Sequence, residues 1–288
     1  IPSLWPTITA GMALVIFETV ADFGGVSTLR VETFTVGIYD AWFGYQSYFS
    51  AARLAGYLLI FVFLIMLIMK YFGAKSNNLA SKTAEKFQKI ETSTFNKVIM
   101  SIICSIIFAL VFCLPTSQLI IWYFSDSALN IFINLQLLIN STFVGVFASC
   151  VTVFFAISLA LSFRQLNSLK PLIIISTSGY AIPGSVISAG LLIGFDFLFD
   201  TSITFYGIFG LIICLALRFM TPAFNYISTS LLNISKSAEY ALATQPSNQL
   251  KAFSYFYLPQ MKPAIYLSLM LVFIESVKEQ PATLLLRP

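Results

Sequence analysis

Long apolar runs separated by short polar stretches dominate the chain. Within the runs the apolar residues are continuous and do not alternate with polar ones, which favours helices over the strands of a membrane barrel. A helix rises 1.5 Å per residue, so about 20 apolar residues cross a hydrocarbon core of about 30 Å. Runs of about that length occur at 6–22, 52–72, 97–123, 136–163, 171–198, 203–224 and 263–280. The pattern predicts an all-α polytopic membrane protein with about seven transmembrane helices.

Composition and charge agree with a lipid bilayer as the surrounding medium. Hydrophobic residues make up 58% of the 288 residues and charged residues only 10%, whereas a soluble domain carries about a quarter charged residues. If the polar linker 73–96 lies inside the cell, eleven lysines and arginines lie on that side of the membrane. Four lie on the other side, and they are Arg30, Arg53, Lys278 and Arg287. The net charge of +4 therefore reflects membrane topology and does not indicate nucleic acid as a partner.

The two ends of the chain repeat each other at a constant offset of 257 residues. The identical pairs include Pro2/Pro259, Pro6/Pro263, Ile8/Ile265, Leu14/Leu271, Val15/Val272, Glu18/Glu275, Val20/Val277 and Arg30/Arg287. Apolar composition alone does not align prolines, an acid and an arginine. We therefore predict two homologous halves: 1–72 is the end of the first, 73–96 is a cytoplasmic linker, and 97–288 is a second half that is incomplete at its C-terminus.

Several kinds of chemistry are missing from the sequence. It contains no histidine, its four cysteines form no C-x-x-C pair, and it has no G-x-x-x-x-G-K-[ST] phosphate loop. No nucleophile and base occur in a recognisable constellation. We therefore expect a chain that is not an enzyme, binds no cofactor, has no metal site of its own and has no ATPase site.

Acidic residues interrupt the first and last apolar runs. Glu18 and Asp22 are four residues apart and share a helix face, and the repeat makes Glu275 and Glu279 their equivalents. Carboxylates at membrane depth are costly and usually face a bundle interior or a cavity. They could form a cation-attracting throat in a translocation pathway. Alternatively, they could pair with nearby cations and hold the two halves in register.

Residues 179–184 read G-Y-A-I-P-G and interrupt the fifth run. Proline flanked by glycines breaks or kinks a membrane helix. Tyr180, Pro183 and Gly184 could then line the pathway as a gate or hinge, or the break could be a packing kink with close helix contact. Arg218 lies late in the sixth run, where we expect its side chain to extend to the inner headgroups; a place in the pathway is the alternative.

The stretch 237–259 is too polar to span a membrane. Apolar residues recur at helical intervals on either side of a break at Pro246, and Leu258–Pro259 begins the next helix. This arrangement resembles the EAA loop of bacterial ABC importer permeases, which reads E-A-A, a glycine, and then L-P. The matching residues are Glu239, Ala241, Leu250, Phe253, Leu258 and Pro259. The stretch departs from the pattern at Leu242, where the loop has alanine, and at Pro246, where it has glycine.

Further strings resemble one branch of these permeases, the two-halved ferric iron transport permeases. They are E-T-V-A-D-F-G-G-V (18–26), T-F-T-V-G-I-Y-D-A-W-F (33–43), G-Y-A-I-P-G-S-V-I-S-A-G-L-L (179–192) and K-E-Q-P-A-T-L-L-L-R-P (278–288). The resemblance implies the type I ABC importer permease fold and ATP-driven import of ferric iron. Similar permeases carry thiamine, phosphonates or other small solutes, so the substrate remains open.

The resemblance also implies partners and a location. A cytoplasmic ABC ATPase dimer, which would use the ATP, is expected to dock on a surface formed by Glu239, Ala241, Pro246, Leu250 and Phe253. A periplasmic solute-binding protein would deliver the substrate to a multi-pass protein of the bacterial inner membrane. An ion-coupled secondary transporter could also have repeats and midplane acids. A non-transporting scaffold would leave those acids unexplained, and the predicted helix–turn–helix before L-P favours the ABC class.

Overall fold

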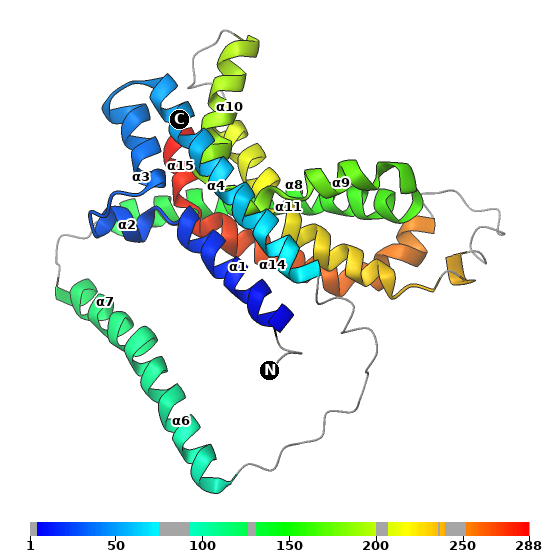
Figure 1. The fold of residues 1–288 in the computed structure, drawn as a ribbon, viewed down its shortest axis with the longest axis horizontal. Helices are drawn as coiled ribbons and strands as arrows, with labels where there is room; N and C mark the ends of the chain where they lie inside the picture. The colour runs from blue at the N-terminus through cyan, green and yellow to red at the C-terminus, as the bar shows by residue number, and fades with distance from the viewer. Residues whose placement is uncertain are drawn as a thin grey trace. The chain divides into compact units, whose positions relative to one another are not determined.

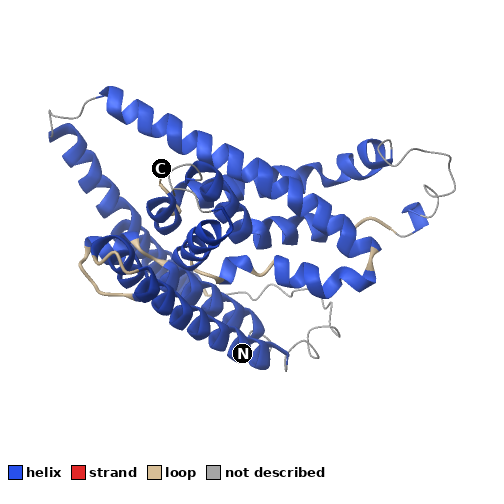
Figure 2. Ribbon diagram, turned by 90° about the horizontal axis from the view of Figure 1, so that it is seen from above, coloured by secondary structure: helices blue, strands red, loops and turns tan. Residues whose placement is uncertain are grey.

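The computed structural model describes residues 5–74, 93–125, 131–199, 207–235, 237–239 and 252–287. These residues form helices and connecting loops, with no strand among them (Figures 1 and 2). The chain divides into two compact units, one formed by 1–78 and 140–288 and the other by 79–139. The predicted acidic residues all belong to the first unit.

Five helices in the described part of the chain are long and apolar enough to cross a membrane. They cover Tyr48–Ile68, Thr94–Ser125, Leu135–Gln165, Gly207–Leu232 and Phe253–Lys278, and each overlaps one of the predicted runs. Helix α1 (Trp5–Ala21) covers the first predicted run with 17 residues, slightly less than the roughly 20 that a straight span needs. A bent pair of helices in the fifth run would make a sixth span if both arms belong to one crossing.

Helices α11 (Gly207–Leu232) and α14 (Leu258–Lys278) pack against each other in the first unit. Phe219, Ile227 and Leu231 are buried on α11 at helical spacing. The last two carry the buried face beyond the predicted end of this run, which explains why the helix is longer than its most apolar segment.

The fifth predicted run is not one straight helix, and its break lies where the string 179–184 predicts it. It contains α9 (Lys170–Ser176), the 3-10 turn η5 (Gly179–Ala181) and α10 (Gly184–Phe199). The arms on either side of the break meet at 116°. Ile182 is extended, with φ −89° and ψ 126°, because the ring of Pro183 disfavours helical geometry in the preceding residue.

The turn at η5 is fastened to α11. The Thr221 hydroxyl donates a hydrogen bond to the Thr177 carbonyl and accepts one from the Tyr180 N–H at 3.2 Å. Gly179 lies so close to α11 that a β-carbon there would overlap the Leu217 carbonyl oxygen. These contacts hold the bend in one position.

The two copies of the repeat contain the same sequence of elements. In the first, α1 is followed by the short helix α2 (Gly24–Thr28); in the second, α14 is followed by α15 (Gln280–Leu286). Ala21 ends α1 and Lys278 ends α14, so the helix ends have the same offset as the matched residues. Each break begins with an acid, Asp22 or Glu279.

The first copy continues through α3 (Phe34–Tyr39), the π-helical turn η2 (Asp40–Gly44) and α4 (Tyr48–Ala74). Helix α4 packs against α1, α3 and α10. Its buried residues recur every three or four positions and are Ala51, Ala55, Leu58 and Val62.

Helix α8 (Ile131–Gln165) has small buried residues at every fourth position, which are Ala148, Thr152, Ala156 and Ala160. Small side chains let membrane helices approach closely. A β-carbon at Gly145 would lie 2.9 Å from Phe273 of α14, and the rings of Phe163 and Phe224 of α11 are 5.6 Å apart. Helix α8 therefore packs along both α11 and α14, and the 3-10 turn η4 (Asn167–Leu169) leads from it to α9.

Besides the first residues of α8, the described part of the second unit is one apolar segment made of α6 (Thr94–Phe108), the π-helical turn η3 (Ala109–Cys113) and α7 (Leu114–Ser125). Pro115 lacks an N–H, so the Val111 carbonyl has no α-helical partner. The π-helical turn beside it accommodates this interruption within the helix.

Candidate functional site

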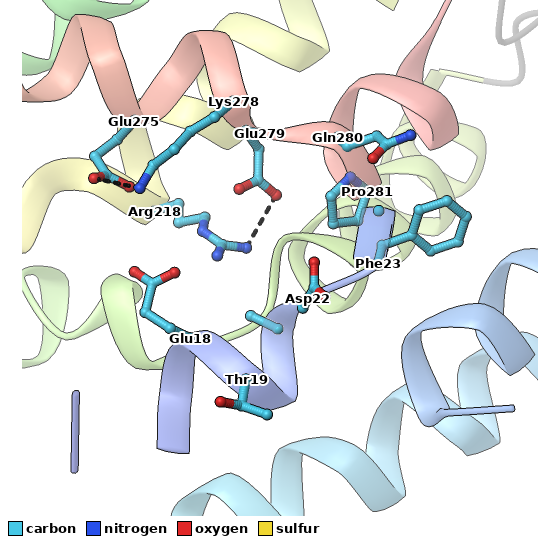
Figure 3. A pocket seen from close by; sticks show the side chains of 12 residues that line it. Glu18, Thr19, Asp22, Phe23, Arg218, Glu275, Lys278, Glu279, Gln280 and Pro281 are labelled. Atoms are coloured by element: carbon cyan, nitrogen blue, oxygen red, sulfur yellow. Dashed lines mark hydrogen bonds and ion pairs between the residues drawn. The ribbon is translucent and has the colours of Figure 1, made fainter. Parts of the chain in front are cut away.

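A cavity of about 410 Å³ lies where α1 and α14 end (Figure 3). The structure brings all four predicted acids to its lining: Glu18, Asp22, Glu275 and Glu279. Two come from each copy of the repeat. Arg218 of α11 and Lys278 of α14 line the same cavity, so it contains charges of both signs.

The innermost charges are a buried ion pair. Arg218 Nη1 lies 3.0 Å from Glu279 Oε1, and the side chains are 7% and 6% exposed. Figure 3 shows the two groups pointing toward each other across the cavity wall. The expectation that Arg218 extends to the headgroups is therefore wrong, because an internal carboxylate offers the guanidinium a partner. Arg218 Nε has no hydrogen-bond partner among the described residues, so one donor remains open.

Gly184 leaves the space in which this pair forms. A β-carbon at this position would overlap the Glu279 carboxylate and lie 2.7 Å from Arg218 Nη1. The first residue of α10 is thus in direct contact with the ion pair. Neither Gly184 nor the buried Pro183 lines the cavity itself, and the contacts at η5 fit a packed break better than a free hinge.

Glu275 is paired within its own helix. Lys278 Nζ lies 2.8 Å from Glu275 Oε1, and the lysine side chain is 55% exposed. A pair this exposed is weak, but it places a positive charge beside the carboxylate. The spacing of three residues that allows this contact can be recognised in the sequence.

The acids of the first copy have no cation partner among the described salt bridges. The Tyr180 hydroxyl donates a hydrogen bond to Glu18 Oε1, which connects α1 to the η5 turn. Asp22 is exposed and accepts only a long hydrogen bond, 3.4 Å, from the Gly25 N–H at the start of α2. In Figure 3 the Glu18 carboxylate points into the cavity toward Arg218.

The two copies of the repeat therefore contribute unequal charge to the cavity lining. Four carboxylates and two cations give it a formal charge of −2. Both ion pairs belong to the second copy, through Glu275 and Glu279. The unneutralised charge is on Glu18 and Asp22. A passing cation would be attracted mainly to the α1 side, because carboxylates in a region of low dielectric act strongly on nearby charge.

Tight metal coordination needs several ligands at one point. Within the described ranges, no three His, Cys, Asp or Glu residues are grouped so that they could hold a metal ion. The lining acids are arranged around a space and do not converge on one position. This geometry can attract cations without binding them firmly.

Sequence reasoning identified the acids but missed Arg218 as their neighbour. An arginine inside an apolar run is a signal for a buried acidic partner. The sequence contains that signal but does not say which acid is the partner. Glu279 is 61 residues away in the chain, and only the packing of α11 against α14 and α15 makes the pair.

The described members of the second group of predicted residues lie near the C-terminal end of α11 and at the start of α14. Ala241, Pro246 and Leu250 fall outside the described residues. Leu258 is the first residue of α14 and Pro259 lies in its first turn, which confirms the predicted helix start. Phe253 is half-buried and begins the π-helical turn η7 (Phe253–Tyr257).

Glu239 does not extend freely into solvent, as a docking residue would. Its carboxylate lies 2.7 Å from Arg164 Nε at the end of α8 and accepts a hydrogen bond of 3.0 Å from the Tyr257 hydroxyl. The side chains of Arg164 and Glu239 are 15% and 22% exposed. The structure thus connects Glu239 to two helices of its own chain.

Comparison with known proteins gives one informative similarity. No protein-family model matches the chain, and no solved structure matches it. The chain is 26% identical over 294 aligned residues to the Fe(3+)-transport system permease protein FbpB 2 of Haemophilus influenzae. The alignment covers 99% of this chain and 58% of that protein, so the chain spans little more than half the length of the relative it matches.

The similarity and the helices agree with each other. A permease of this kind is a multi-pass protein of the inner membrane, and the described residues contain five helices that could cross a membrane. The predicted resemblance to ferric iron permeases is confirmed along nearly the whole chain. The chain is thus similar to an Fe(3+)-transport permease along nearly its whole length. The charged cavity lies within this similar region, where α1 and α14 end.

Proposed function

We propose that this chain belongs to the permease of an ATP-driven importer that carries ferric iron across the bacterial inner membrane. The observation that carries the proposal is the similarity to an Fe(3+)-transport permease over 99% of the chain. A periplasmic solute-binding protein would release the iron to the outer side. A cytoplasmic ATPase dimer would supply the energy, since the sequence contains no phosphate loop.

In this proposal the charged cavity belongs to the translocation pathway. Its net negative lining would lower the barrier for a cation that leaves water. Conduction also requires that the ion can leave again, so binding must be weak. Carboxylates spread over two helices and partly neutralised by Arg218 and Lys278 suit that requirement.

The stretch from Glu239 to Pro259 would couple the permease to the ATPase. Its resemblance to an EAA loop supports this role. Contacts at its described ends give further support. Glu239 is close to the end of α11, and Tyr257 directly precedes α14, the helix that brings Glu275 and Lys278 to the cavity.

Transport by the purified full-length protein tests the proposal. The protein is reconstituted in liposomes with its ATPase and binding protein, and uptake of radioactive ferric iron is measured. We expect uptake that requires ATP, is stopped by vanadate, and persists when ion gradients are dissipated. Gradient-driven uptake without ATP would instead indicate an ion-coupled secondary transporter. Uptake of thiamine or a phosphonate in place of iron would overturn the substrate and leave the transporter class intact.

A further inference from the structure

Arg164 connects parts of the chain that are far apart in sequence. It lies in the last turn of α8, and its Nε and Nη2 reach the two oxygens of Glu239 at 2.7 and 3.0 Å. Bidentate contacts between a guanidinium and a carboxylate fix direction as well as distance. The pair joins residues 75 positions apart.

The same guanidinium also binds the end of α11. Arg164 Nη1 donates a hydrogen bond to the Leu231 carbonyl, and Nη2 donates one of 2.6 Å to the Ile234 carbonyl. The last carbonyls of a helix have no partner within the helix and carry partial negative charge, so a cation is favoured there. Arg164 therefore holds the ends of α8 and α11 together.

Tyr257 adds a third helix to this contact. Its hydroxyl donates a hydrogen bond of 3.0 Å to Glu239 Oε1, which brings the start of α14 to the same carboxylate. We call Arg164, Glu239 and Tyr257, with the Leu231 and Ile234 carbonyls, the clasp. Glu239 precedes the stretch 240–251 in sequence and Tyr257 follows it, so the clasp fixes the positions of residues on both sides of this stretch.

We propose that Arg164 is a positioning residue for energy coupling, and that Glu239 acts through it rather than through direct contact with the ATPase. The inference rests on the proposed function, since it assumes that an ATPase docks on this side. The guanidinium joins α8 to the end of α11 and to Glu239, and the Tyr257 hydroxyl extends this contact from Glu239 to the start of α14. Any force on the docking stretch would be passed through the clasp to these three helices together.

The first test uses the full-length protein without its partner. Hydrogen exchange is measured for peptides covering 231–239 and 252–257 in the wild type and in Arg164→Gln. We expect faster exchange in both peptides of the variant. Glu239 loses the guanidinium that fixes its position, and the Tyr257 hydroxyl thereby loses a fixed acceptor. Lys170→Gln is the matched control, since Lys170 is a nearby cation that contacts the Phe163 ring. Unchanged exchange in Arg164→Gln overturns the clasp.

The second test is a double-mutant cycle on ATPase affinity. We expect Arg164→Gln to weaken binding of the ATPase on the order of tenfold, and Glu239→Gln added to it to change little further, because both remove one interaction. Independent losses that add up would mean that Glu239 touches the ATPase itself, which overturns the proposal.

If Arg164→Gln does not fold, Tyr257→Phe removes one hydrogen bond with the ring retained and should show the same exchange changes to a smaller extent. A wild-type protein that binds no ATPase would refute the proposed function, whereas the exchange result tests the clasp separately.

Discussion

The Arg218 guanidinium and the Glu279 carboxylate meet 3.0 Å apart at the lining of the cavity, and both are nearly inaccessible to solvent. Removing two charges from water is expensive, and their attraction compensates only when the geometry is good. Two neighbours decide that geometry here. Gly184 offers the space, and the break after α14 places Glu279 opposite α11.

Gly184→Ala should destabilise the protein, because the added methyl group overlaps the Glu279 carboxylate. Overpacking of this kind costs about 1–3 kcal/mol. Gly190→Ala in the same helix is the matched control, since a β-carbon there meets nothing within 4 Å. Thermal unfolding in detergent should show a lower midpoint for the first variant and an unchanged or higher midpoint for the second. Equal midpoints would contradict the close contact.

Removing one member of the ion pair should be worse than removing both. Arg218→Met leaves the Glu279 carboxylate buried without a partner, for which we expect a loss of about 3–5 kcal/mol in the free energy of unfolding. The double variant Arg218→Met/Glu279→Leu has no unpaired charge and should recover most of that loss. Chemical denaturation of the three proteins measures this. A double variant less stable than Arg218→Met would show that the pair itself stabilises the fold.

At the scale of elements, the bend between α9 and α10 depends on contacts with a neighbouring helix. Pro183 and the extended Ile182 explain why the helix stops. They do not explain the angle of 116°. That angle is held by Thr221 and by the close approach of Gly179 to α11.

Thr221→Val should loosen this bend, because valine keeps the shape of threonine but loses the hydrogen bonds to Thr177 and Tyr180. Leaving such partners unsatisfied costs about 1–3 kcal/mol. Thr229→Val makes the same change on an exposed position of the same helix and should have little effect. Thermal midpoints of the two variants decide the matter. A small effect of both would mean that the Thr221 hydrogen bonds do not hold the bend.

These elements also show what sequence can and cannot predict. The apolar runs predict the long helices, because length and composition decide whether a segment suits a bilayer. The string A-I-P-G predicts a break near Pro183. The direction after the break is set by Thr221, far away in sequence, so no local pattern contains it. The four acids could be predicted because the sequence repeat aligns them in pairs. The pairing of Arg218 with Glu279 could not be predicted, because it depends on the packing of helices that are distant in sequence.

At the scale of the whole chain, the two copies of the repeat contribute different charge to the lining of one cavity. The second copy supplies both ion pairs, and the first supplies carboxylates without cation partners in the described salt bridges. A repeat in sequence therefore does not imply equal charge at the cavity. The α1 side of the cavity should act most strongly on a cation.

Glu18→Gln should lower the rate of ferric iron uptake more than Glu275→Gln, because Lys278 already offsets the charge of Glu275. Replacing both should lower uptake far more than either change alone, with protein level and ATPase binding near normal. Glu32→Gln, at an exposed acid that does not line this cavity, is the control. Uptake by reconstituted protein measures the rates. A double variant that fails to accumulate in the membrane would show that these acids are structural.

The π-helical turn η7 immediately before α14 has a geometric consequence for this machinery. A π-helical turn contains one residue more than an α-helical turn, and each α-helical residue advances the helix by about 100°. Because this turn ends at Tyr257, its extra residue sets the rotational phase between Ala252 and the whole of α14, which includes Glu275 at the cavity. Deleting one residue from 253–256 would turn Ala252 by about 100° around the helix axis relative to Tyr257 and Glu275. Tyr257 and Glu275 would still face Glu239 and the cavity, whereas the chain would enter α14 from a different direction.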